Sequence, residues 1–374
     1  LHGSDFNAKA LLREPKSDRE VLLATIVHDM DDGRGHALLD VPGLLFDRRM
    51  QPDTLTPLAL GVIANARGTV AGKGQIDWNP AGVTSTGRFA TERLDFAAAF
   101  GPVKGVSGAV EFTDLLGIVT APDQRLKIAS INPGIEVEDG TMSFELQGNN
   151  VLLVNGARWP FMDGTLELQP SRMVLGAAEV RRYTLAVEGL NAAKFVERLE
   201  LSNISASGSF DGVLPLVFDE DGGHIEGGLL TSRPPGGNVS YVGELTYKDL
   251  GTMGNFAFQA LRSLDYRQMR VAMDGNLEGD IVTRVRLDGV TQGTGAKRNF
   301  ITQRFAKLPI QFNINVRAPF QRLVTTFKSI YDPTYVRDPR ELGIVDGNGQ
   351  PVRQESKPPP GTPDIQAPDS RNKP

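Results

Sequence analysis

Alternation of apolar and polar residues with a period of two is the strongest pattern in the chain. It is clearest in residues 142–146, 269–273, 281–287 and 310–316. The apolar residues expected to share one face of each strand are Met142, Phe144 and Leu146; Met269, Val271 and Met273; Ile281, Val285 and Leu287; and Ile310, Phe312, Ile314 and Val316. The pattern predicts β-strands with one apolar and one polar face.

Short turn motifs separate the predicted strands. They occur at residues 79–82, 139–140, 147–150 and 163–164, each containing glycine with asparagine or aspartate. Strands joined by tight turns favour an antiparallel meander, and the lack of long helices between them disfavours parallel βαβ units. The glycines of residues 208–228 are expected to form bends and bulges that curve the sheet.

A few short helices are expected between the strands. Asn191, Asn255 and Pro319 each stand at the start of a stretch with apolar residues at helical spacing. A fourth helix is expected after Asp53 or Thr54, either of which would cap it. These helices are too few for a bundle, so the fold class predicted is all-β, or mainly β.

Composition narrows the function classes. The chain has 374 residues, 40% of them apolar, with 41 glycines and 24 prolines, which fits a turn-rich β fold. A net charge of -5 without a basic cluster argues against nucleic acid as a partner. The absence of cysteine excludes disulfides, thiolate metal sites and thiol catalysis. No apolar run is long enough to span a bilayer.

Candidate catalytic and metal-binding motifs fail on their spacing. The four histidines are scattered, and residues 29–40 lack the ligands of a calcium loop. The glycines around Lys73 are one residue short of a phosphate loop, so a bulged strand is expected there. Asp219, Glu220 and Asp221 are adjacent rather than opposed, which does not favour paired-carboxylate catalysis. We therefore predict no catalytic residue, no metal and no cofactor.

The apolar strand faces allow two interpretations. They could form the core of a β-sandwich, or they could line an open trough that meets lipid chains. Alternation alone does not distinguish a covered face from an open one.

Three sequence motifs, in a fixed order along the C-terminal third, are typical of a known family. They are PPGGNVSYVGE at residues 234–244, residues 254–293, and residues 308–333, which include LPIQFNINVRAPFQRLV. Together they resemble the C-terminal region of YdbH-type proteins, members of the AsmA-like superfamily of Gram-negative envelopes. The match is dense over about residues 200 to 335, and less specific motifs upstream resemble the same family.

The resemblance implies a bridge-like lipid transfer protein. In such a protein an elongated, curved antiparallel sheet folds like a taco around a hydrophobic groove for phospholipid acyl chains. It implies transport from the inner to the outer membrane across the periplasm, in support of outer-membrane lipid homeostasis. The thirteen alternating residues named above would line the groove, and no catalytic residue carries over. The alternatives are an envelope assembly scaffold and an accessory to dicarboxylate transport.

The resemblance also implies partners and a domain division. An N-terminal inner-membrane anchor is expected in a segment that this chain lacks, since we interpret the chain as the C-terminal portion of a longer one. A small outer-membrane lipoprotein is expected to add a strand at the C-terminal sheet edge. The predicted regions are a repetitive β-groove segment at 1–200, a family-specific β-groove region with short helices at 201–336, and a disordered proline-rich tail at 337–374.

Overall fold

The structure is a computed structural model. It describes residues 5–59, 62–98, 101–132, 136–175, 180–198, 204–219, 222–241, 263–277, 280–292 and 310–317. The chain divides into two compact units, residues 1–336 and 337–374, and every described residue belongs to the first. The predicted tail and the helix expected after Pro319 lie outside the described residues. The division at residue 200 stays a prediction.

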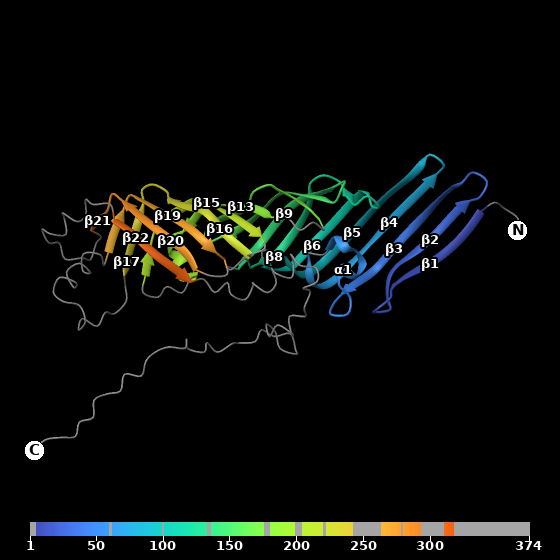
Figure 1. The fold of residues 1–374 in the computed structure, drawn as a ribbon, viewed down its shortest axis with the longest axis horizontal. Coiled ribbons are helices and arrows are strands. Elements are labelled where there is room, and N and C mark those ends of the chain that lie inside the picture. Colours follow the sequence, from blue (N-terminus) through green and yellow to red (C-terminus); the bar gives the residue numbers. More distant parts are fainter. Residues whose placement is uncertain are drawn as a thin grey trace, which may run out of the picture. The chain divides into compact units, whose positions relative to one another are not determined.

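Eighteen of the described strands form one large sheet (Figure 1). They are β1 (Asp5–Glu14), β2 (Arg19–Asp29), β3 (Arg34–Phe46), β4 (Ala64–Asn79), β5 (Gly82–Ala98), β6 (Gly101–Asp114), β7 (Val119–Thr120), β8 (Gln124–Ile131), β9 (Val137–Gln147), β10 (Val151–Phe161), β11 (Gly164–Leu168), β12 (Ser171–Val174), β13 (Arg181–Asn191), β15 (Ser209–Asp219), β16 (Gly222–Ser232), β19 (Gln268–Asn276), β20 (Asp280–Asp288) and β22 (Ile310–Arg317).

Strand pairing in the large sheet follows the chain. From one edge the strands pair in the order β1, β2, β3, β4, β5, β6, β8, β9, β10, β11, β13, β15, β16, β19, β20 and β22, always antiparallel. The short strands β7 and β12 pair with β6 and β10. Within the described part, β1 pairs only with β2, and β22 only with β20, so the sheet is open. The predicted antiparallel, mainly-β fold is confirmed.

A second, smaller sheet contains strands of two to five residues. It pairs β14 (Ile204–Ala206), β17 (Gly237–Tyr241), β18 (Ser263–Tyr266) and β21 (Thr291–Gln292) in that order. The helix expected from Asn255 begins outside the described residues, and its last predicted residue, Leu264, lies in β18. The extended backbone there is fixed by pairing with Val239 of β17.

The helices in the described part are short. They are α1 (Pro52–Leu55), the 3₁₀ turn η1 (Pro57–Ala59) and α2 (Ala192–Arg198). The cap predicted for α2 is confirmed, because the Asn191 side-chain oxygen accepts hydrogen bonds from the N–H groups of Ala193 and Lys194, at 2.9 and 3.4 Å.

The prediction for α1 was wrong in its position. Gln51, rather than Asp53 or Thr54, precedes the helix, and Pro52 begins it. The helix stops at Leu55 because Thr56 is extended, at φ -150 and ψ 133, as the residue before a proline usually is.

The predicted turn at residues 139–140 was also wrong, since both residues lie inside β9. Asp139 has a positive φ of 58°. Aspartate tolerates this left-handed backbone conformation better than most other residues do. Gly140 leaves room for the indole of Trp159 on β10: a Cβ at Gly140 would lie 2.0 Å from Trp159 Nε1. A tryptophan nineteen positions further along the chain therefore explains this glycine. The turns at 79–82, 147–150 and 163–164 do connect consecutive strands.

Bulges bend the sheet where glycines were expected to do so. The registers of β15 with β16, and of β16 with β19, shift near residues 213–216 and 225–228. At the second shift Gly227 has a φ of 69°, and its N–H donates to Asp274 Oδ1 at 2.7 Å. The strand around Lys73, β4, also contains the expected bulges, with register shifts on both sides of Gly68.

Candidate functional site

One face of the large sheet is apolar along the cross-strand register. A row of directly paired residues crosses β1 to β6: Ala10, Ala24, Leu39, Gly74, Gly87 and Phe112. A second row crosses β10 to β20: Trp159, Leu166, Val187, Gly212, Leu230, Val271 and Val285. We call the side that carries these rows the inner face. Because paired residues share a side, the inner face is apolar across most of the sheet.

The opposite side, the outer face, is mainly polar from β3 to β6. In the first half of the sheet, the paired residues Asp40, Lys73, Arg88 and Glu111 form an outer row. Arg88 Nη1 lies 3.2 Å from Glu111 Oε1, and both side chains are more than half exposed. Along the same strands, therefore, solvated charges lie on the outer face and apolar residues lie on the inner face.

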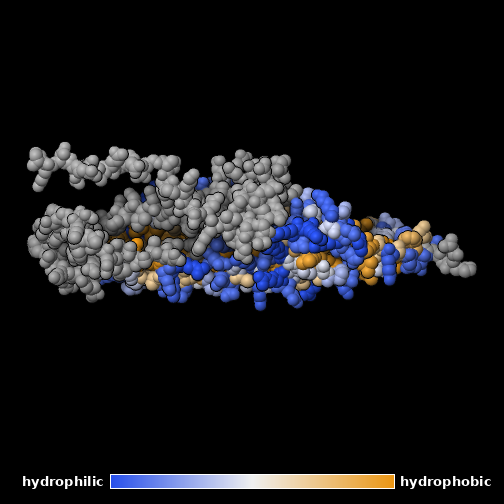
Figure 2. All heavy atoms as spheres, turned by 90° about the horizontal axis from the view of Figure 1, so that it is seen from below, coloured by the Kyte–Doolittle hydropathy of each residue, from blue (hydrophilic) through white to orange (hydrophobic). Residues whose placement is uncertain are grey.

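The inner face of β1–β5 is uncovered towards the hairpin ends of its strands, and we call this face the open region. Phe6, Leu12 and Val83 are 55%, 53% and 58% exposed. On β4 the inner residues Ile76 and Trp78 are half-buried, while Gln75 and Asp77, which alternate with them on the outer face, are exposed. Orange, hydrophobic atoms are visible beside these strands in Figure 2. Exposed apolar surface of this kind marks a binding surface more often than isolated exposed residues do.

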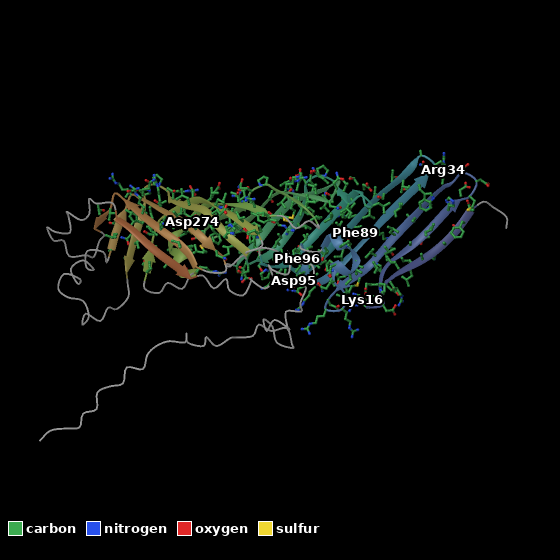
Figure 3. The ribbon with its side chains drawn as sticks, viewed as in Figure 1. Lys16, Arg34, Phe89, Asp95, Phe96 and Asp274 are labelled. Atoms are coloured by element: carbon green, nitrogen blue, oxygen red, sulfur yellow. The ribbon has the colours of Figure 1, made fainter. Side chains whose placement is uncertain are left out.

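Aromatic rings and one hydrogen bond order the open region. Trp78 Nε1 donates to His28 Nδ1 at 3.1 Å. Phe89 on β5, labelled in Figure 3, meets Phe112 edge to face, with ring centroids 5.9 Å apart. The glycines at positions 72 and 87 leave room for the Phe89 ring.

A corner between β3 and β4 covers one end of the open region. Met50 is fully buried there against Val41, Leu44 and Phe46, and Ile63 packs on the same cluster. Gln51 fixes the corner, because its side chain donates to Ala66 O at 2.9 Å and accepts from Ala66 N at 2.8 Å.

An ion pair holds the start of the same corner. Arg19 Nη2 lies 2.5 Å from Asp47 Oδ2. The hydrogen bond from Arg19 lowers the pKa of Asp47 below its ordinary value.

From β6 onward the inner face is buried or half-buried, and we call β10–β20 the covered region. Trp159, Leu166, Val187 and Leu287 are only 2% to 4% exposed. The small sheet adds Leu264 and Tyr266 to the same apolar cluster, and α2 adds Phe195. These elements form part of a second layer over the inner face.

Tyr266 joins the small sheet to the rest of the covered region. Its hydroxyl donates to Ser207 O at 2.7 Å. Burial raises the pKa of Tyr266 to about 12, so the phenol stays neutral at physiological pH.

The structure places the predicted groove residues on strands β9, β19, β20 and β22. The buried ones are Phe144, Met269, Ile281 and Leu287, and the half-buried ones are Met142, Leu146, Val271, Met273 and Val285. In the register, Val285 pairs with Phe312, Ile281 with Val316, Thr283 with Ile314, and Leu287 with Ile310. Their role as a lipid-groove lining stays a prediction.

The described residues were expected to contain neither a metal site nor a membrane-spanning helix. Within them, no three His, Asp or Glu side chains are grouped so that they could hold a metal ion. None of the helices in that part has the length and apolar character needed to cross a membrane.

Comparison with known families decides the relationship. The family model described as YdbH-like, intermembrane phospholipid transport protein YdbH, matches residues 3–341. The chain belongs to this family. Neither a curated protein nor a solved structure matches the chain. The family description names lipid transport rather than a catalysed reaction, which agrees with the polar outer and apolar inner faces.

Family membership directs attention to residues that the alternation pattern did not single out. Phe6, Ile76, Trp78 and Phe89 belong to the open region, where the apolar face is accessible. Residues 68–78 alternate regularly, but glycines occupy several inner positions and weaken the apolar signal. Scoring glycine as compatible with an apolar face would have found this strand.

Proposed function

We propose that the inner face is a path for the acyl chains of phospholipids between the inner and outer membranes. The observation that carries the proposal is the uncovered inner face of β1–β5, where Phe6, Leu12 and Val83 are more than half exposed. The YdbH-like family match supports phospholipid as the cargo. The thirteen residues predicted from alternation extend the proposed path towards β22.

Energetics favours a continuous face over separate pockets. Each methylene exposed to water costs about 0.8 kcal/mol, so a 16-carbon chain that crosses water unaided loses roughly 12 kcal/mol. Rows of apolar residues that run from strand to strand lower this barrier at every step. The paired row from Ala10 to Phe112 has this property on the open region, and the row from Trp159 to Val285 continues it beneath the covering layer.

The proposed setting is the periplasm. An inner-membrane anchor in a segment outside this sequence would hold one end, and lipid would move towards the outer membrane to maintain its lipid content. The edge of β22, which within the described part pairs only with β20, offers a site for strand addition by a small outer-membrane lipoprotein.

A charge placed on the inner face tests the proposal. In cells that depend on this protein for outer-membrane integrity, Ile76→Asp is expected to abolish function while the protein still accumulates. Gln75→Asp, one residue away on the outer face, is the matched control and should function normally. Val285→Arg and Phe312→Asp extend the test towards the C-terminal strands. Normal function of Ile76→Asp and both extension variants would reject the path.

A further inference from the structure

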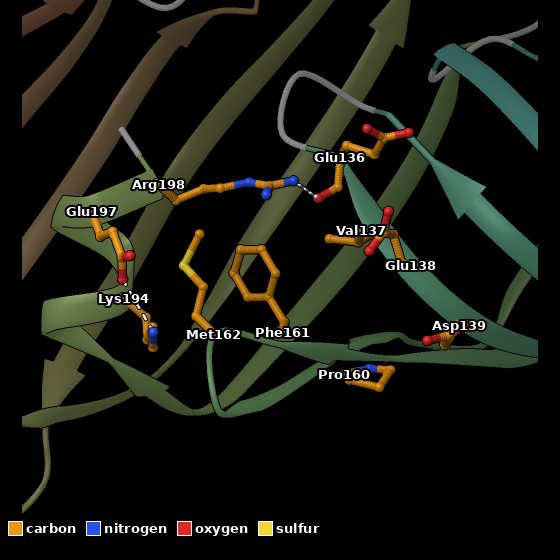
Figure 4. A pocket seen from close by; sticks show the side chains of 10 residues that line it. All are labelled: Glu136, Val137, Glu138, Asp139, Pro160, Phe161, Met162, Lys194, Glu197 and Arg198. Atoms are coloured by element: carbon orange, nitrogen blue, oxygen red, sulfur yellow. Dashed lines mark hydrogen bonds and ion pairs between the residues drawn. The ribbon is translucent and has the colours of Figure 1, made fainter. Parts of the chain in front are cut away.

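A pocket of about 560 Å³ lies at the rim of the inner face, where β9 and β10 meet α2 (Figure 4). Its apolar side is formed by Val137, Phe161 and Met162, which also belong to or pack on the main apolar cluster. The pocket is therefore continuous with the inner face. Its volume falls within the range of about 300 to 1,000 Å³ typical of small-ligand sites.

The charged side of the pocket contains both signs. Glu136, Glu138 and Asp139 come from the start of β9 and the residue before it, and Lys194, Glu197 and Arg198 come from α2. Figure 4 shows the Arg198 side chain extending from α2 towards Glu136. The cavity thus combines an apolar surface with side chains of both positive and negative charge.

Some of these charges already have partners. Lys194 Nζ lies 3.1 Å from Glu197 Oε2, and Lys104 Nζ lies 3.5 Å from Glu136 Oε1. Arg198 Nη2 donates to the carbonyl oxygen of Glu136 at 3.2 Å, which leaves its charge without a carboxylate partner in the described part of the chain.

Two carboxylates remain available. In the described residues Glu138 and Asp139 form no hydrogen bond or ion pair through their side chains, and both are exposed. One guanidinium and two carboxylates are therefore free beside an apolar floor. This arrangement is complementary to a group that carries a phosphate, an ammonium and an acyl chain.

We propose that this pocket binds the headgroup of an amine-bearing zwitterionic phospholipid while its acyl chain lies on the inner face. Arg198 contacts the phosphate, and Glu138 and Asp139 contact the ammonium. The two carboxylates repel anionic headgroups that lack the ammonium. This inference rests on the proposed function, because it assigns the headgroup class to the same lipid path.

The test measures which lipids the purified full chain retains. The protein is incubated with vesicles of equal parts phosphatidylethanolamine and phosphatidylglycerol and re-isolated, and the bound lipids are quantified by mass spectrometry. The parent chain should retain the ethanolamine lipid in excess. The double variant Glu138→Lys/Asp139→Lys should lower the ratio about threefold or more, as expected for two exposed charge contacts.

Two further variants separate the headgroup site from general charge effects. The double variant Asp40→Lys/Asp77→Lys makes the same charge change on the outer face and should leave the ratio unchanged. Arg198→Gln removes a contact common to both lipids, so it should lower the total bound lipid and preserve the ratio.

The failures are distinguishable. If the parent retains no lipid, the proposed function fails and this inference fails with it. If lipid is retained but the ratio is the same in the parent and in Glu138→Lys/Asp139→Lys, the headgroup site alone is rejected.

Discussion

The two tryptophans of the chain lie on the same face of one sheet in different surroundings. Trp78, in the open region, is half-buried, and its indole donates to His28 Nδ1 at 3.1 Å. Trp159, in the covered region, is 3% exposed, and its Nε1 has no hydrogen-bond partner in the described part of the chain. The same alternation thus produces an accessible apolar face and a buried one, and the second layer makes the difference.

This difference suggests a division of labour along the sheet. In the covered region the small sheet and α2 pack over the inner face and stabilise the fold. In the open region the corner that contains Met50 covers one end, and Leu115, in the turn after β6, lies over Gly74 and Gly87. Phe6, Leu12 and Val83 stay available to a ligand. Stability should therefore respond strongly to substitutions in the covered region and weakly to those in the open region.

Replacing each tryptophan by alanine should show the largest contrast. Trp159→Ala removes a large buried side chain and should lower the free energy of unfolding by about 3–5 kcal/mol. Trp78→Ala removes a half-buried ring and one hydrogen bond, so the loss should be about 1–2 kcal/mol. Urea unfolding of the two variants measures both values. Equal losses would show that the two regions are covered alike.

A smaller effect is expected where a side chain is added on β9, against Trp159 of the covered region. Gly140→Ala places a Cβ 2.0 Å from Trp159 Nε1, so the indole must move, at a cost of about 1–3 kcal/mol. Gly148→Ala is the matched control in the following turn, where a Cβ would meet nothing within 4 Å. Thermal unfolding should separate the two variants, and a stable Gly140→Ala would contradict the close packing of Trp159.

The smallest effect concerns the corner at the end of the open region. The hydrogen bond from Arg19 lowers the pKa of Asp47, so its stabilisation is present at neutral pH and is lost as pH falls through that lowered pKa, below about 3.9. Both side chains are partly exposed, at 25% and 38%, so solvent keeps the contribution below about 1 kcal/mol. Asp47→Asn should be less stable than the parent at pH 7, and the difference should shrink at pH 3. A difference that is the same at both pH values would exclude this role for the ion pair.

Alternation along the chain was sufficient to predict the strands at residues 142–146, 269–273 and 281–287 and their two faces, but not the glycine-rich strands of the open region. It works for Met142, Val271 and Val285 because the period of two is a property of a single strand, independent of what lies above it. The antiparallel order also follows from local turns, such as the one at residues 79–82.

The covering layer could not be predicted in this way. The small sheet is built from strands of two to five residues, which are too short to show a period, and its pairings join distant segments such as Asp265 and Thr291. Leu264 was assigned to a helix for this reason. Gly140 looked like part of a turn because its packing partner, Trp159, lies on the next strand.

Lipid contact at one pair of neighbouring residues tests the central claim most directly. A photo-crosslinking amino acid is placed in cells at Ile76, on the inner face of β4, or at Gln75, on its outer face. The proposal predicts phospholipid adducts at position 76 and none at position 75, as detected by mass spectrometry. Equal lipid capture at both positions, or capture of protein alone at position 76, would contradict it.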